Sequence, residues 1–90
     1  MCRNIKLLFN FEPPTTQDEI RAAALQFVRK VSGYNKPSKN NEAAFMAAIE
    51  QITAASRVLL DSLETSAAPK SREEDAVKAR MRYVQRLPRQ

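Results

Sequence analysis

The sequence has little of what common enzymes and metal proteins depend on: it contains one glycine, one cysteine, no histidine and no tryptophan. A single glycine excludes a glycine-rich phosphate-binding loop. The absence of histidine removes the most frequent general base and metal ligand. One cysteine excludes an internal disulfide and a cysteine-based zinc cluster. These absences favour a non-catalytic protein, and they predict neither a cofactor nor a bound metal.

Long apolar runs are also missing. The longest covers residues 43–49, far short of the roughly 20 residues that a transmembrane helix requires. Near the N-terminus only Leu7, Leu8 and Phe9 form an apolar stretch, whereas a signal peptide needs about seven such residues. We therefore expect a cytoplasmic protein without a membrane contact, and a single reduced thiol fits that compartment.

What is present is the composition of one small soluble domain. Of the 90 residues, 43% are hydrophobic and 28% are charged, a mixture too apolar for a disordered chain. A chain of this length buries only about 60–65% of its unfolded surface. Its stability must therefore come from a well-packed helical core or from a partner chain.

The net charge of +5 is unevenly distributed along the chain. Residues 1–75 contain ten basic and ten acidic residues, and so are neutral overall. Residues 76–90 contain five basic residues and no acidic one; these are Lys78, Arg80, Arg82, Arg86 and Arg89. Such an asymmetry bears on partners and solubility rather than on the fold.

Helix signals appear in three places. The first predicted helix, residues 17–32, begins at a capping box formed by Thr16 and Glu19 and ends at Gly33. The second, residues 41–63, would be roughly 34 Å long. The third, residues 72–87, begins at a second capping box, formed by Ser71 and Glu74, and ends before Pro88. These helices, after an extended segment over residues 1–15, would make a single domain spanning the whole chain.

The predicted fold is all-α, with the first two helices forming an antiparallel hairpin. The apolar N-terminal segment would pack on this hairpin, and the third helix would be a basic C-terminal helix. Apolar residues recur at spacings of three and four, which marks one face of each helix. The predicted core consists of Ile20, Phe27, Val28, Phe45, Ile49, Ile52 and Leu59. A second row on the long helix, Met46, Thr53 and Leu60, indicates that it is covered on more than one side.

Several stretches of the chain resemble one protein family. They are MCRNI (1–5), FEPP (11–14), EIRAAALQ (19–26), VRKVSG (28–33), NKPS (35–38) and LLDSL (59–63). Together they resemble an uncharacterised family of small bacterial proteins catalogued as domain of unknown function 2277. The resemblance covers roughly residues 1–80 and implies a small helical protein, with no activity or catalytic residue to carry over. Residues 81–90 depart from the usual end of the family, so a basic patch there would be peculiar to this protein.

Cys2 is the one candidate for covalent chemistry. Removal of Met1 would leave a terminal thiol and amine beside Arg3, which favours the thiolate. A nucleophile also needs an oriented base, and the chain has no histidine. The simpler interpretation, a structural cysteine near a terminus, is therefore favoured over a reactive thiol. The neighbouring carboxylates of residues 61–64 and 73–75 likewise fit solvated positions and a helix start better than a metal site.

Two regions are candidates for binding an anion. Between the first two helices, Lys36, Lys39 and Tyr34 lie in a polar linker, where lysines and a stacking aromatic could hold a phosphate or a base. In the third helix, Lys78, Arg82 and Arg86 share one side, Arg80 lies elsewhere around the helix, and Tyr83 lies between them. Basic residues interleaved with an aromatic are typical of nucleic-acid-binding surfaces. An ordinary solvated turn and a helix dipole are the alternative interpretations.

The sequence leaves three classes of function open. The first is a small binding module that contacts nucleic acid or another polyanion through the basic C-terminal residues, including Arg89. The second is a helical protein that binds other proteins or serves as a scaffold. In that case we expect a homodimer, because Leu25, Met46 and Leu60 lie off the main apolar rows. An enzyme that uses Cys2 ranks last.

Overall fold

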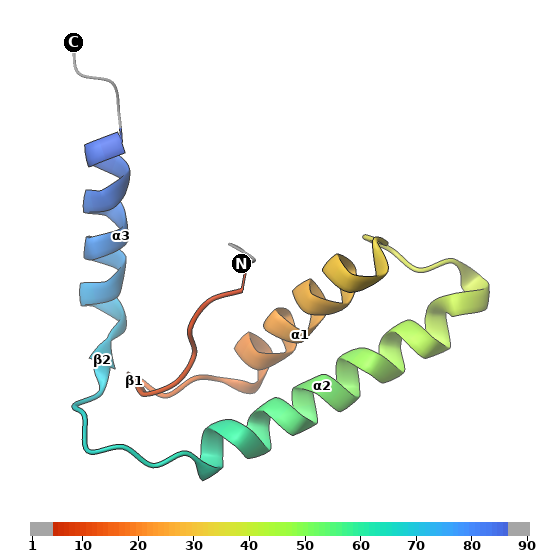
Figure 1. The fold of residues 1–90 in the computed structure, drawn as a ribbon, viewed down its shortest axis with the longest axis horizontal. Coiled ribbons are helices and arrows are strands. Elements are labelled where there is room, and N and C mark those ends of the chain that lie inside the picture. The colour runs from red at the N-terminus through yellow and green to blue at the C-terminus, as the bar shows by residue number, and fades with distance from the viewer. Residues whose placement is uncertain (1–4, 87–90) are drawn as a thin grey trace.

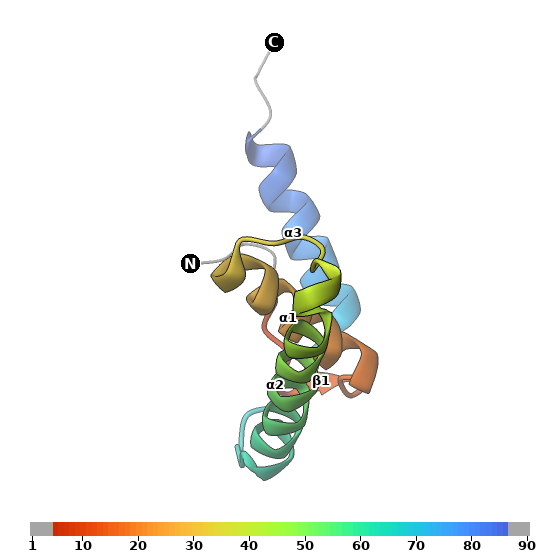
Figure 2. The same cartoon turned by 90° about the vertical axis from the view of Figure 1, so that its right-hand side faces the viewer.

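The computed structural model describes residues 5–86, and 67% of these residues are helical. In chain order the elements are β1 (Phe11–Glu12), α1 (Gln17–Ser32), the short 3₁₀ helix η1 (Lys39–Asn41), α2 (Glu42–Ser62), β2 (Lys70–Ser71) and α3 (Arg72–Arg86). α1 and α2 lie side by side and run in opposite directions, while α3 rises away from them (Figure 1). Turned by 90°, the molecule is thin (Figure 2), with extents of 50 × 41 × 18 Å.

α1 begins and ends where local chemistry dictates. The Thr16 hydroxyl accepts a hydrogen bond from the Glu19 amide (3.2 Å), and the Glu19 carboxylate accepts one from the Thr16 amide (3.0 Å). This is the predicted capping box, which satisfies two amides that the first helical turn leaves without partners. At the other end, Gly33 adopts φ 79°, and its amide donates to the Arg29 carbonyl. A left-handed residue of this kind ends a helix at little cost only when it is glycine.

The contribution of the Thr16 cap to the stability of α1 can be tested by substitution. Thr16→Ala should lower the free energy of unfolding by about 1 kcal/mol, because the Glu19 amide loses its acceptor. Thr16→Ser keeps the hydroxyl and should stay close to the parent protein. Urea denaturation of the three proteins measures the difference; equal losses in both variants would show that the hydroxyl does not stabilise the helix.

The core lies between α1 and α2. Its cluster contains Ala24, Val28, Phe45 and Ile49, and Ile20 is also buried. Among the residues that the structure describes, the remaining buried side chain is polar: the Thr53 hydroxyl donates to the Ile49 carbonyl (2.6 Å), so its burial leaves no unsatisfied group.

Part of the predicted core is wrong. Phe27 is 46% exposed and Leu59 is 56% exposed, and Ile52 is half-buried. The prediction assumed that further elements cover the flanks of the two helices. In the structure α2 is covered mainly by α1, so only the stripe of residues that faces α1 is fully buried.

The N-terminal segment departs from the all-α expectation. β1 pairs in parallel with β2, with Phe11 opposite Lys70 and Glu12 opposite Ser71. The two strands form a minimal sheet that links the start of the chain to the start of α3. The segment thus connects the hairpin to α3, in addition to lining the side of α1 near Ala23 and Gln26.

Candidate functional site

A set of contacts fixes the first turn of α3 to the rest of the molecule, and we call this set the root of α3. At its centre is Arg72, whose guanidinium donates to both Glu19 carboxylate oxygens (Nη1 to Oε2, 2.7 Å; Nη2 to Oε1, 2.8 Å). Its third nitrogen, Nε, donates to the Pro13 carbonyl (2.9 Å). A planar guanidinium suits such a forked contact, which fixes orientation as well as position.

The same ion pair changes the acidity of Glu19. Hydrogen bonds from Arg72, and then from the Thr16 amide, lower the pKa of Glu19 from 4.5 to about 2. The carboxylate in turn raises the pKa of Arg72. Glu19 therefore has two roles, since it completes the cap of α1 and anchors α3.

Polar and aromatic contacts complete the root. The side-chain amide of Asn10 donates to the Ala67 and Ala68 carbonyls (3.3 and 3.2 Å), and the Lys70 amide donates to the Asn10 carbonyl (2.7 Å). The ring of Phe11 lies beneath two cations, with its centroid 5.8 Å from Lys70 Nζ and 5.6 Å from Arg72 Cζ. Distances of this size allow cation–π attraction. The direction of α3 is thus set at its first turn.

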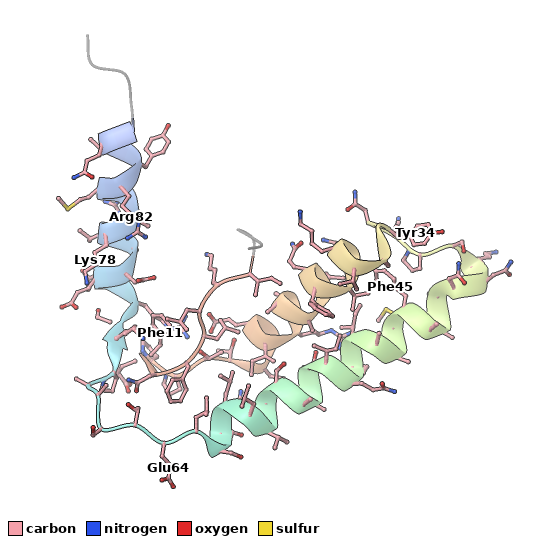
Figure 3. All side chains as sticks on the ribbon, viewed as in Figure 1. Phe11, Tyr34, Phe45, Glu64, Lys78 and Arg82 are labelled. Atoms are coloured by element: carbon pink, nitrogen blue, oxygen red, sulfur yellow. The ribbon has the colours of Figure 1, made fainter. Side chains whose placement is uncertain are left out.

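Beyond the root, α3 is a projecting arm. Its residues from Glu73 to Gln85 are all exposed. Lys78, Arg80 and Arg82 make no ion pair within the described part of the chain. Lys78 and Arg82 stand on this arm, well away from the α1–α2 pair (Figure 3). Arg86 is the last helical residue, and its side chain, like Arg89, lies outside the described residues.

The linker between α1 and α2 forms a second candidate site at the other end of the molecule (Figure 3). Here Lys36 lies at the edge of a hollow of about 460 Å³. The hollow is lined by apolar residues from both helices, with Arg21 and Arg29 also at its boundary; the apolar members include Leu25, Phe45, Met46 and Ile49. Tyr34 is 53% exposed and, like Lys39, does not line the hollow. Of the three predicted anion-binding residues of the linker, Lys36 alone therefore lines this hollow.

The linker also uses its polar groups internally. Arg29 Nε donates to the Asn35 carbonyl (3.1 Å), the Tyr34 amide donates to the Ser32 hydroxyl (3.2 Å), and the Asn41 side chain donates to the Ser38 hydroxyl (3.1 Å). These bonds account for the polar composition of the segment as a structured turn. They favour the simpler interpretation of the linker over a dedicated phosphate site.

The remaining candidate site residues are Cys2 and the acidic side chains. Cys2 lies outside the described residues. Within residues 5–86, no group of three or more aspartate, glutamate, histidine or cysteine side chains is placed to hold a metal. Asp61, expected to be solvated, is 61% exposed and pairs with Arg57 (3.2 Å), which also donates to the Thr15 carbonyl (3.4 Å). The root of α3 could not be predicted from local sequence patterns, because its partners lie more than fifty positions apart.

Comparison with known protein families identifies the family of this chain. Residues 1–79 match the family described as Uncharacterized conserved protein (DUF2277). The chain belongs to this family. The matched region includes the hairpin, both strands and the root of α3, and it ends in the middle of α3, before Arg80 and Arg82. No curated protein and no solved structure matches the chain.

Proposed function

We propose that this family member is a small non-catalytic binding module that contacts a polyanion, with nucleic acid as the test case, through α3. In this proposal the antiparallel pair of α1 and α2 is the scaffold, and the basic C-terminal helix is the binding element. The observation that carries the proposal is the exposure of Lys78, Arg80 and Arg82 on this arm, where none of the three forms an ion pair with another described residue.

The helix dipole explains only part of this charge pattern. Acidic residues at the start of α3 and basic residues toward its end both stabilise a helix. One or two basic residues in the last turn satisfy that preference. Residues 76–90 contain five basic residues and no acidic one, a surplus that helix stability does not require.

The spacing of the charges supports a continuous surface. Lys78 and Arg82 are four residues apart, so they lie on the same side of the helix, one turn apart. Tyr83 follows directly and is 63% exposed, so its ring is available for stacking on a base. We expect binding to depend mainly on phosphate contacts and to be largely independent of sequence.

The test is a titration of duplex DNA and of RNA at increasing salt. If all five basic residues contact phosphates, the logarithm of the affinity should fall with the logarithm of the salt concentration with a slope of about −4 to −5. The double variant Lys78→Gln, Arg82→Gln should reduce that slope by roughly two. Both side chains are exposed, so the helical circular dichroism should not change.

A charge-matched control uses the other candidate region. The double variant Lys36→Gln, Lys39→Gln removes the same charge at the far end of the molecule and should leave the slope as it is. A drop in slope for this control alone would move the binding site to the linker. No binding at about 50 mM salt, where the electrostatic attraction is strong, would reject the proposed function.

A further inference from the structure

The chain exposes more surface than a compact domain of its mass. Its accessible area is 7701 Å², whereas a folded monomer of 10.2 kDa is expected to expose about 5,300 Å². Even if the eight residues outside 5–86 were as exposed as in an unfolded chain, more than about 1,000 Å² of the excess would remain. The radius of gyration, 16.4 Å, also exceeds the roughly 12 Å of a compact domain of this length.

One large uncovered surface lies on α2. Its four charged residues (Glu42, Glu50, Arg57 and Asp61) fall within about a third of the helix circumference by helical spacing. The side that faces neither these residues nor α1 contains no charge. We call it the charge-free side of α2; it comprises Ala44, Ala47, Gln51, Ala54, Ala55, Val58 and Leu59, all of them exposed.

Phe27 extends this surface onto α1. Leu25 and Met46 line one hollow and so mark one flank of the α1–α2 pair. By helical spacing, Phe27 lies on the opposite side of α1 from Leu25, and Ala55 lies on the opposite side of α2 from Met46. The exposed ring of Phe27 therefore shares the other flank with the charge-free side of α2.

The length and composition of α2 also indicate that its apolar surface is uncovered. Among the described residues, the segment Lys39–Ser62 is long and apolar enough to cross a membrane by these two criteria alone. The core helix of a globular protein passes the same test, but such a helix is mostly buried. Here only 17% of the apolar stretch is buried, so most of its apolar surface lacks cover.

A second uncovered surface lies on α3. Val77, Met81 and Val84 are spaced by four and three, so they form one stripe, and they are 44%, 58% and 58% exposed. A hollow between α3 and the N-terminal segment is lined by Ala76, Ala79 and Arg82 on the opposite side of the helix. The apolar stripe of α3 thus faces away from its own chain.

We propose that a second copy of this chain covers both surfaces, so that the working form is a homodimer. The root contacts hold the first turn of α3 in place, so the stripe cannot reach the charge-free side of its own α2 without breaking them. A helix of 15 residues is marginal without packing. The excess area exceeds the roughly 800 Å² per chain that a stable interface buries.

The dimer goes beyond polyanion binding and leaves two of the three exposed basic residues of α3 free; the third, Arg80, lines one hollow with Val77, Met81 and Val84 and so borders the proposed interface. Lys78 and Arg82 lie about a quarter turn or more from the centre of the apolar stripe, so they remain free when the stripe is covered. Each copy carries a net charge of +5, so the two copies repel one another. Added salt screens that repulsion and should strengthen the dimer, whereas it weakens polyanion binding. The opposite salt responses separate the two proposals.

The test is the mass of the full chain by sedimentation, from about 1 to 200 μM at 50 and 300 mM salt. We expect twice 10.2 kDa, with dimerisation at least tenfold weaker in Val58→Glu and in Met81→Glu. Tyr34→Glu adds the same charge at an exposed residue outside both surfaces and should dimerise as the parent does. Circular dichroism of each variant separates loss of the interface from loss of folding.

Several results would overturn the dimer. A monomer mass at 200 μM is one, and binding of that monomer to lipid vesicles would instead assign the charge-free side of α2 to a membrane. A monomer with a scattering radius near 12 Å would show that α3 folds back on its own chain. Equal weakening in Tyr34→Glu, or none in both Val58→Glu and Met81→Glu, would show that the interface lies elsewhere.

Discussion

Phe45→Ala should lower the free energy of unfolding by about 3–5 kcal/mol, the usual cost of removing a buried phenylalanine. The Phe45 side chain is only 8% exposed and packs in one cluster with Ala24, Val28 and Ile49. Proteins of this length are stable by about 5–13 kcal/mol in total. The substitution therefore removes a large part of the stability of the pair formed by α1 and α2.

Phe27→Ala is the matched control, because it deletes the same side chain from a position that is 46% exposed. Its loss should be well under half that of Phe45→Ala when both are measured by urea denaturation at one low protein concentration. If Phe45→Ala does not fold, Phe45→Leu gives a smaller loss on the same scale. Equal losses at the two positions would contradict the assignment of the core.

The contrast between these two residues shows how far periodicity predicts packing. The positions of Ile20, Val28, Phe45 and Ile49 follow from spacings of three and four, and all four are buried. Phe27 obeys the same spacing, yet it is exposed. Periodicity identifies the apolar part of a helix, but it does not say how much of that part another element covers.

The helix starts were easier to predict than the surfaces. The capping box at Thr16 and the stop at Gly33 depend on residues within four positions of one another, so the sequence displays them directly. The root of α3 depends on Arg72 and Glu19, which are 53 positions apart. Glu19 alone looks like an ordinary acidic residue in a first helical turn, and Arg72 alone carries no sign of its distant partner. No local sequence rule links these two residues, and the resemblance to the family implied no contact between them.

The root also makes a prediction about acidity. Arg72→Ala should raise the pKa of Glu19 from about 2 toward 4.5, because the largest cause of the lowering is removed. The rise should be incomplete, since the Thr16 amide still donates to the same carboxylate. Arg72→Lys keeps the charge but loses the fork, and should give an intermediate value. Titration of the Glu19 carboxyl carbon by NMR measures all three.

The pH dependence of stability should change accordingly. The pKa of Glu19 is lower in the folded chain than its ordinary value of 4.5, so the folded state favours the carboxylate. The stabilisation by the pair is therefore complete above about pH 4.5, and it is lost as the pH falls toward 2. Between those limits the unfolding midpoint of the parent protein should fall more steeply than that of Arg72→Ala, while the other carboxylates contribute alike to both. Parallel curves, together with an unchanged pKa of Glu19 in the variant, would mean that the Thr16 cap alone lowers the pKa of Glu19 and that Arg72 does not anchor α3.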